Sequence, residues 1–128
     1  MAPRPFIDWF VAGHFQLTEG DKEQSLQMIR DLLDKRNASQ PTGTANCGSV
    51  FRNPPGNYAG RLIESCGLKG FAIGGACVSE KHANFILNEN DASASDIETL
   101  IMHIRQVVEE KTGVSLTPEV CMMGKSSR

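Results

Sequence analysis

Residues 48–88 read GSVFRNPPGNYAGRLIESCGLKGFAIGGACVSEKHANFILN, and this stretch carries most of the short structural signals of the chain. SVF predicts a short extended piece, because residues just before a proline avoid the helical conformation. Asn57 is expected to cap a short helix over residues 58–66, which Gly67 ends. FAIGGACVS predicts two short strands kinked at the glycine pair, and NFILN predicts another strand.

Two longer helices are expected on either side of this stretch. The first starts after Asp21, whose side chain can cap it, with Gln24 at the third helical position. Its apolar residues recur at helical spacing: Leu26, Ile29, Leu32 and Leu33. The second lies within DASASDIETLIMHIRQVVEEKTG, where Ser95 and Glu98 match a capping box and Gly113 is a stop signal.

Both ends of the chain are expected to contain strands. FIDWFVAGHFQL, residues 6–17, is rich in aromatic and apolar groups and would need a partner sheet, so we expect 1–17 to be the remnant of a preceding region and 18–128 to be a separate domain. An open apolar strand edge favours pairing, so 6–17 is also a candidate dimer contact. LTPEVCMMG predicts a strand after Pro118. This element order predicts an α+β fold, a small mixed sheet with helices packed on one face.

Composition excludes several classes of function. The chain has 128 residues, 40% of them hydrophobic and 22% charged, which is typical of one soluble domain. A net charge of −2 argues against non-specific nucleic-acid or polybasic membrane binding. No apolar run approaches the roughly 20 residues of a membrane span, and the N-terminus does not resemble a signal peptide. The four cysteines form no CxxC pair, so we expect free, buried thiols and a reducing cytoplasm.

The loop FRNPPGN could hold a ligand. Two prolines stiffen it, and Ser49, Arg52 and Asn53 stand immediately before them. A stiff backbone with polar side chains suits a preorganised site. A solvated connector between a strand and a helix explains the same residues, so both interpretations remain open on composition.

Three other residues are candidates for binding or catalysis. Lys69 stands between two glycines, where it could meet a phosphate or be a surface lysine. His82 could bind a ligand or be a solvated turn residue, and metal binding is not expected because no second ligand stands at a suitable spacing. Glu119 precedes an apolar strand and could be catalytic or simply solvated.

These pieces, in this order, resemble the C-terminal domain of the UDP-N-acetylenolpyruvoylglucosamine reductase (MurB) family. The resemblance is dense from about Cys47 to Asn88 and extends more loosely from about His14 to Gly124. The family is a bacterial cytoplasmic flavoenzyme of peptidoglycan precursor synthesis, in which NADPH reduces FAD and the flavin reduces UDP-N-acetylglucosamine enolpyruvate to UDP-N-acetylmuramate. The resemblance therefore implies a fold like that domain.

The resemblance also implies roles for individual residues. Ser49 in GSVF matches the serine that donates a proton, and Glu119 in PEV matches the catalytic glutamate. Asn53 in RNP and Lys69 in LKG match substrate-binding positions, and the lysine is expected near the diphosphate. His82 falls at a further substrate-side position.

Some residues depart from the family pattern. Arg52 stands where a lysine is usual, Cys121 replaces an arginine after the glutamate, and Ser39 lies near a phosphate-binding lysine of some members. The FAD-binding part and its catalytic arginine are not found in the sequence. We therefore expect no FAD or NADPH bound to this chain alone, and expect the missing FAD-binding domains to be its partner.

Two further interpretations compete with the enzyme part. The chain could be a stand-alone UDP-sugar-binding module without redox activity, or a structural domain whose loops only connect elements. UDP binding distinguishes the first from the second.

Overall fold

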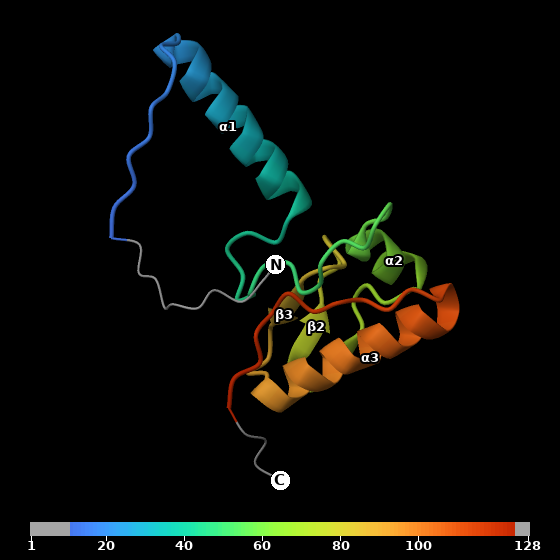
Figure 1. The fold of residues 1–128 in the computed structure, drawn as a ribbon. Coiled ribbons are helices and arrows are strands. Elements are labelled where there is room, and N and C mark those ends of the chain that lie inside the picture. The colour runs from blue at the N-terminus through green and yellow to red at the C-terminus, as the bar shows by residue number, and fades with distance from the viewer. Residues whose placement is uncertain (1–10, 125–128) are drawn as a thin grey trace.

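The computed structural model describes residues 11–124, which form three helices and one small sheet (Figure 1). In chain order the elements are α1 (Lys22–Ser39), α2 (Ala59–Ser65), β1 (Ala72–Ile73), β2 (Ala76–Val78), β3 (Ile86–Asn88) and α3 (Ala94–Thr112). α3 packs against β1, β2 and α2. The predicted α+β class is confirmed.

The sheet has the strand order β1-β2-β3, and both pairings are antiparallel. Ile73 pairs with Ala76 across the predicted glycine kink, and Cys77 pairs with Leu87. A two-residue turn can join only antiparallel strands, because parallel strands need a long crossover. The sheet in the described part of the chain is therefore antiparallel, where a mixed sheet was expected.

The glycine kink allows a close approach of two backbones. A Cβ placed on Gly75 would lie 2.5 Å from the amide nitrogen of Ala92 and would also clash with the carbonyl oxygen of Asn90. The Gly75 carbonyl accepts the Glu89 N–H at 3.2 Å. Because Gly75 has no Cβ, the loop between β3 and α3 can pack directly against its backbone.

The core lies between α3 and the sheet. α3 buries one face of four residues, Leu100, Ile101, Ile104 and Val108. Their partners come from the sheet, from α2 and from the connecting segments, among them Val50, Phe51, Ile63, Val78 and Leu116. Ile97 and Val107, on the same side of α3, are partly buried against this core.

α3 begins two residues earlier than predicted. Its capping box is formed by Ser93 and Asp96, with Asp96 N–H donating to Ser93 Oγ at 3.1 Å and Ser93 N–H donating to Asp96 Oδ2 at 2.9 Å. The predicted pair, Ser95 and Glu98, lies inside the helix. A Cβ on Gly74 would clash with the Asp96 carboxylate, so the glycine kink leaves room for this cap.

The predicted cap of α2 is also wrong. Asn57 Oδ1 accepts the N–H of Tyr58, whereas the N–H of Ala59, at the start of the helix, donates to Asn53 Oδ1 at 3.0 Å. Gly67 has a left-handed φ of +76° just after the helix and ends it as predicted.

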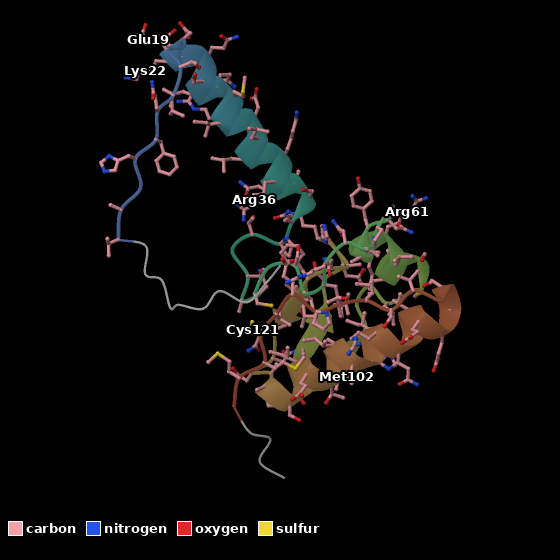
Figure 2. The ribbon with its side chains drawn as sticks, viewed as in Figure 1. Glu19, Lys22, Arg36, Arg61, Met102 and Cys121 are labelled. Atoms are coloured by element: carbon pink, nitrogen blue, oxygen red, sulfur yellow. The ribbon has the colours of Figure 1, made fainter. Side chains whose placement is uncertain are left out.

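α1 forms as predicted but buries none of its residues against the described part of the chain. Asp21 Oδ1 accepts the Gln24 N–H at 2.7 Å, which confirms the predicted N-cap. None of its residues is buried, and the helix projects away from the rest of the molecule (Figure 1). Its residues are exposed along its whole length (Figure 2).

The strands expected at the chain ends are not formed where the structure describes them. Residues 11–17 are exposed and unpaired, while residues 6–10 of that predicted strand lie outside the described residues, so a dimer through 6–17 stays a prediction. A strand needs hydrogen-bonding partners, and this apolar segment finds none in the described chain. Near the other end, Phe51 forms an isolated bridge with Pro118, and residues 120–123 form no strand. No helix within residues 11–124 is long and apolar enough to cross a membrane.

Candidate functional site

Residues 49–53, called here the serine segment, run beside the segment leading to Glu119. The Glu119 N–H donates to the Val50 carbonyl at 2.8 Å, and the Arg52 N–H donates to the Thr117 carbonyl at 2.9 Å. These bonds place the serine and the glutamate expected to be catalytic on adjacent, antiparallel pieces of backbone.

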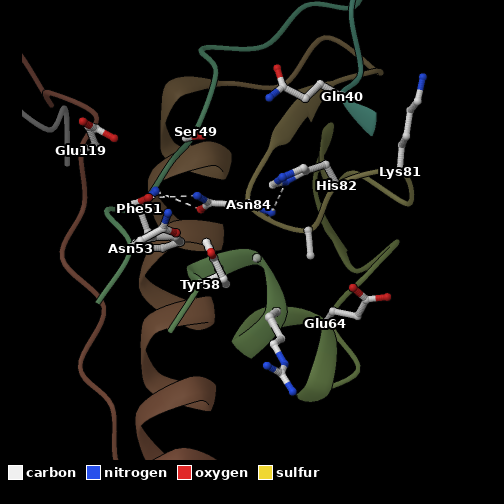
Figure 3. Close-up of a pocket in the computed structure, with 13 residues that line it drawn as sticks. Gln40, Ser49, Phe51, Asn53, Tyr58, Glu64, Lys81, His82, Asn84 and Glu119 are labelled. Atoms are coloured by element: carbon white, nitrogen blue, oxygen red, sulfur yellow. Dashed lines mark hydrogen bonds between the residues drawn. The ribbon is translucent and has the colours of Figure 1, made fainter. Parts of the chain in front are cut away.

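Asn84 holds the other edge of the serine segment. It is buried, with only 4% of its surface exposed. Its side-chain Oδ1 accepts the Phe51 N–H at 3.0 Å and its Nδ2 donates to the Phe51 carbonyl at 2.9 Å (Figure 3). Its backbone carbonyl also accepts the Val50 N–H at 2.9 Å. Asn84 therefore pairs with this segment as a neighbouring strand would.

Sequence reasoning missed Asn84. The available signal was its position within the otherwise apolar run around HANFIL, because a polar side chain among buried residues needs hydrogen-bond partners. Its partners come from residues more than thirty positions away, which no local pattern specifies.

An open cavity of about 480 Å³ lies over the serine segment. Four of the five predicted site residues line it: Ser49, Asn53, His82 and Glu119 (Figure 3). The side chains of Ser49, Asn53 and Glu119 are exposed, and that of His82 is half-buried. The fold thus brings together residues that are up to 70 positions apart in the sequence.

Lys69, the fifth predicted site residue, does not line the cavity. Its Nζ pairs with Glu64 Oε1 at 2.7 Å, and that glutamate does line the cavity. Two cations absent from the sequence-based candidates, Arg61 and Lys81, are part of the lining. Arg61 stands in α2, where the amphipathic pattern gave no reason to single it out.

Lys81 also connects the site to α1. Its Nζ donates to the carbonyl oxygen of Asn37, near the C-terminal end of that helix. A cation at a helix C-terminus complements the partial negative charge of the unpaired carbonyls. Gln40, the C-cap residue of α1, is another lining residue of the cavity.

All four cysteines are free, as predicted, but two of them are exposed. Cys66 is buried and Cys77 is half-buried, whereas Cys47 and Cys121 are exposed. Burial raises the pKa of the Cys77 thiol, with smaller contributions from nearby glutamates. Within residues 11–124, no group of three or more His, Cys, Asp and Glu side chains is arranged to hold a metal ion.

Comparison with known protein families identifies the domain. Residues 40–123 match the family described as UDP-N-acetylenolpyruvoylglucosamine reductase, C-terminal domain. The chain belongs to this family. The MurB resemblance expected from the sequence is therefore confirmed, and the matched range contains every residue of the cavity lining named above.

Individual relatives agree with this assignment. A UDP-N-acetylenolpyruvoylglucosamine reductase of Legionella pneumophila (strain Paris) is 56% identical over 121 residues, covering 94% of this chain and 40% of the relative. One from Coxiella burnetii (strain Dugway 5J108-111) is 57% identical over 118 residues, covering 92% of this chain and 37% of the relative. The chain thus spans 37–40% of the length of these relatives.

A solved structure supports the fold. The crystal structure of UDP-N-acetylenolpyruvylglucosamine reductase (MurB) from Thermus caldophilus matches with a TM-score of 0.67 and 36% sequence identity. The match covers 81% of this chain and 36% of that protein.

Proposed function

We propose that this chain is the C-terminal, substrate-binding part of a UDP-N-acetylmuramate dehydrogenase of peptidoglycan synthesis. The complete reaction would reduce UDP-N-acetylglucosamine enolpyruvate with NADPH through FAD. In this proposal residues 18–128 bind the UDP-sugar and supply Ser49 and Glu119, residues 1–17 belong to the preceding region, and the cellular location is the bacterial cytoplasm.

The observation that carries the proposal is the shared cavity of Ser49, Asn53, His82 and Glu119 in a chain of this family. Asn53 uses its Oδ1 to accept the Ala59 N–H. That bond fixes the carboxamide and leaves its NH₂ as the group available to a ligand oxygen. A fixed donor costs little ordering entropy on binding.

The diphosphate of the substrate would meet the cationic side of the cavity. Arg61 can bind phosphate oxygens with two donors at once, and Lys81 adds a second positive charge. Lys69 would act here mainly by neutralising Glu64, whose carboxylate would otherwise repel the phosphates. Charge reversal at Arg61 should therefore weaken UDP binding more than charge reversal at Lys69.

Ser49 would deliver the proton that completes reduction of the enolpyruvyl group. Hydride addition leaves negative charge spread from the carbon into the neighbouring carboxylate, and such a carbon is basic enough to accept a proton from a serine hydroxyl. The rigid serine segment would hold the hydroxyl on one face of that carbon.

Glu119 would stabilise the charged intermediate, which requires it to be protonated or paired with a cation when substrate is bound. An ionised, unpaired glutamate would repel the developing negative charge. Glu119→Gln should therefore lower turnover in the assembled enzyme, and full turnover of this variant would disprove the role.

In this proposal the flavin dinucleotide is held by the remainder of the enzyme, because side chains already occupy part of each helix N-terminus in the described part of this chain. A pyrophosphate commonly binds at a helix N-terminus. Here Asp21 caps α1, Asn53 takes the first N–H of α2, and Ser93 with Asp96 closes α3. We therefore assign FAD and NADPH to the remainder of the enzyme, and no step on this chain is built on them.

The preceding part of the reductase is the proposed partner, and α1 offers it a docking surface. α1 lies outside the matched family domain, which begins at residue 40, and more than half of each relative's length is unmatched by this chain. Five large apolar side chains of α1 are exposed: Leu26, Met28, Ile29, Leu32 and Leu33. Burying them would remove an apolar surface from water.

The test is to supply the unmatched N-terminal part of the Legionella pneumophila relative in trans. The proposal predicts NADPH oxidation that depends on the enolpyruvyl substrate, loss of that oxidation with Ser49→Ala, and slower amide hydrogen exchange in α1 on mixing. Oxidation that is unaffected by Ser49→Ala would contradict the proton-donor role.

The second candidate function is a UDP-sugar-binding module without redox activity, for which the cationic lining of Arg61 and Lys81 would suffice. UDP binding to the chain, combined with no substrate-dependent NADPH oxidation after mixing, would support this alternative.

A further inference from the structure

Asn84 is hydrogen-bonded both to the serine segment and to His82, two parts of the cavity lining. Three of its groups, Oδ1, Nδ2 and the backbone carbonyl, hold the serine segment. Its fourth group, the backbone N–H, donates to Nδ1 of His82 at 3.2 Å (Figure 3). One buried residue therefore fixes both the segment that carries the serine and the imidazole opposite it.

The imidazole ring of His82 is enclosed on more than one side. The Phe85 ring meets it edge-on, with ring centroids 4.9 Å apart and an interplanar angle of 70°. A Cβ on Gly60 would lie 3.2 Å from its Cε1, so only a glycine leaves the ring its present space. The His82 backbone N–H also donates to the buried Ser79 Oγ.

The bond from Asn84 determines which nitrogen carries the proton. A nitrogen that accepts an N–H hydrogen bond must present a lone pair, so Nδ1 is unprotonated in this arrangement. The neutral ring then carries its proton on Nε2. His82 lines the cavity and its Nδ1 is already bonded to Asn84, so Nε2–H is the polar group of the ring left for a bound ligand.

We propose that Asn84 is a positioning residue that holds His82 as the neutral Nε2–H tautomer, a fixed hydrogen-bond donor to an oxygen of the UDP-sugar. Gly60 supports the same ring position by leaving it space. The identity of the ligand rests on the proposed function, whereas the tautomer and its dependence on Asn84 are properties of the free chain.

The first experiment is ¹⁵N NMR of the full chain with labelled histidine, which distinguishes the two neutral tautomers at alkaline pH. The Nε2–H form is expected to dominate for His82. Asn84→Ala keeps the backbone N–H that donates to His82 but removes the two side-chain bonds to Phe51 that fix residue 84. It should let this N–H move away from Nδ1 and so produce a mixture of tautomers. The matched control is Asn88→Ala, because Asn88 Oδ1 accepts the Ala92 N–H at 2.8 Å outside this cavity, and it should leave the His82 tautomer unchanged.

Asn84→Ala removes buried hydrogen bonds and can unfold the chain, so Gly60→Ala is the second variant. It keeps every bond to the serine segment and crowds only the imidazole, so it should also produce a tautomer mixture. A dominant Nδ1–H form in the unaltered chain would overturn the proposal, as would an unchanged tautomer in both folded variants.

The second experiment measures binding of UDP-N-acetylglucosamine enolpyruvate to His82 variants. His82→Phe keeps the ring but removes the donor, and it should weaken binding about tenfold, which corresponds to one neutral hydrogen bond. His82→Gln keeps an N–H donor and should retain most of the affinity. Equal losses in both variants would contradict the donor role.

The two experiments separate the two possible failures. If the unaltered chain does not bind the UDP-sugar while His82 shows the Nε2–H form and responds to Asn84→Ala, the proposed function fails and the positioning role stands. If the chain binds the UDP-sugar and His82 is in the Nδ1–H form, the positioning role fails and the function stands.

Discussion

α1 and α3 are nearly equal in length, at 18 and 19 residues, and each begins with a side-chain N-cap. α3 buries four apolar residues against the sheet and α2, whereas α1 buries none. The five large apolar side chains of α1 are between 43% and 59% exposed. Local signals therefore form both helices, but only one of them contributes to the core.

The difference shows what a helical pattern leaves undetermined. An N-cap and a helical spacing of apolar residues depend only on residues a few positions apart, so α1 has both without packing on another element. Burial needs a complementary surface, and the described chain provides one only for α3. Isolated helices of this length are marginal in water, so α1 should be the less protected of the two.

The free energy of unfolding should differ most between two truncations, Ile104→Ala in α3 and Leu32→Ala in α1. Ile104 is 1% exposed, so its truncation leaves a cavity and should lower the free energy of unfolding by about 2–5 kcal/mol. Leu32 is 59% exposed, and its truncation should cost about 0.5 kcal/mol or less. Urea unfolding followed by NMR signals of α3 measures both, and equal losses would show that α1 is packed in solution.

Glycine substitution gives the next largest effect. Gly75→Ala places a methyl group against the backbone at Ala92 and should lower the free energy of unfolding by about 1–3 kcal/mol. Gly20→Ala, just before α1, has nothing within 4 Å and should be neutral. A neutral Gly75→Ala in the same urea experiment would mean that the loop after β3 shifts freely.

Removing the N-cap of α3 should destabilise the whole fold, whereas removing the N-cap of α1 should affect that helix alone. Ser93→Ala should lower the free energy of unfolding by about 1 kcal/mol, because α3 belongs to the cooperative core. Asp21→Ala should reduce the helical circular dichroism contributed by α1 without shifting the unfolding of α3. An equal shift of the α3 transition by both variants would show that the helices unfold as one unit.

The smallest expected effect is the pH dependence of the α3 cap. Hydrogen bonds from the backbone and side chain of Ser93, and from the backbone of Gly75, hold the pKa of Asp96 below its ordinary value. The carboxylate therefore stabilises the fold above the pKa it has in the unfolded chain, and this contribution is lost as the pH falls below about 4.

Asp96→Asn should remove that part of the acid sensitivity, and Ser93→Ala should reduce it. Melting temperatures of the three proteins between neutral pH and the acid range measure the effect. If the unaltered chain and Asp96→Asn lose stability in parallel over this range, the carboxylate makes no such contribution.

The sequence by itself determined the α+β class, the positions of all three helices to within a turn, the glycine kink between two strands and the family. Each of these depends on local signals, such as Asp21 before α1 or Gly67 after α2, or on the order of motifs along the chain. The same signals identified Ser49 and Glu119 as candidate site residues.

Only the tertiary structure decided which interactions those signals lead to. Asn84 pairs with Phe51 across 33 positions. Lys69 is paired with Glu64 and does not line the cavity, whereas Arg61 does. Of two similar capping sequences, Ser93 with Asp96 forms the cap of α3, and Ser95 with Glu98 lies inside the helix. Local sequence fixes backbone propensity, but a hydrogen bond or a packed face requires a partner that the folded chain must bring into place.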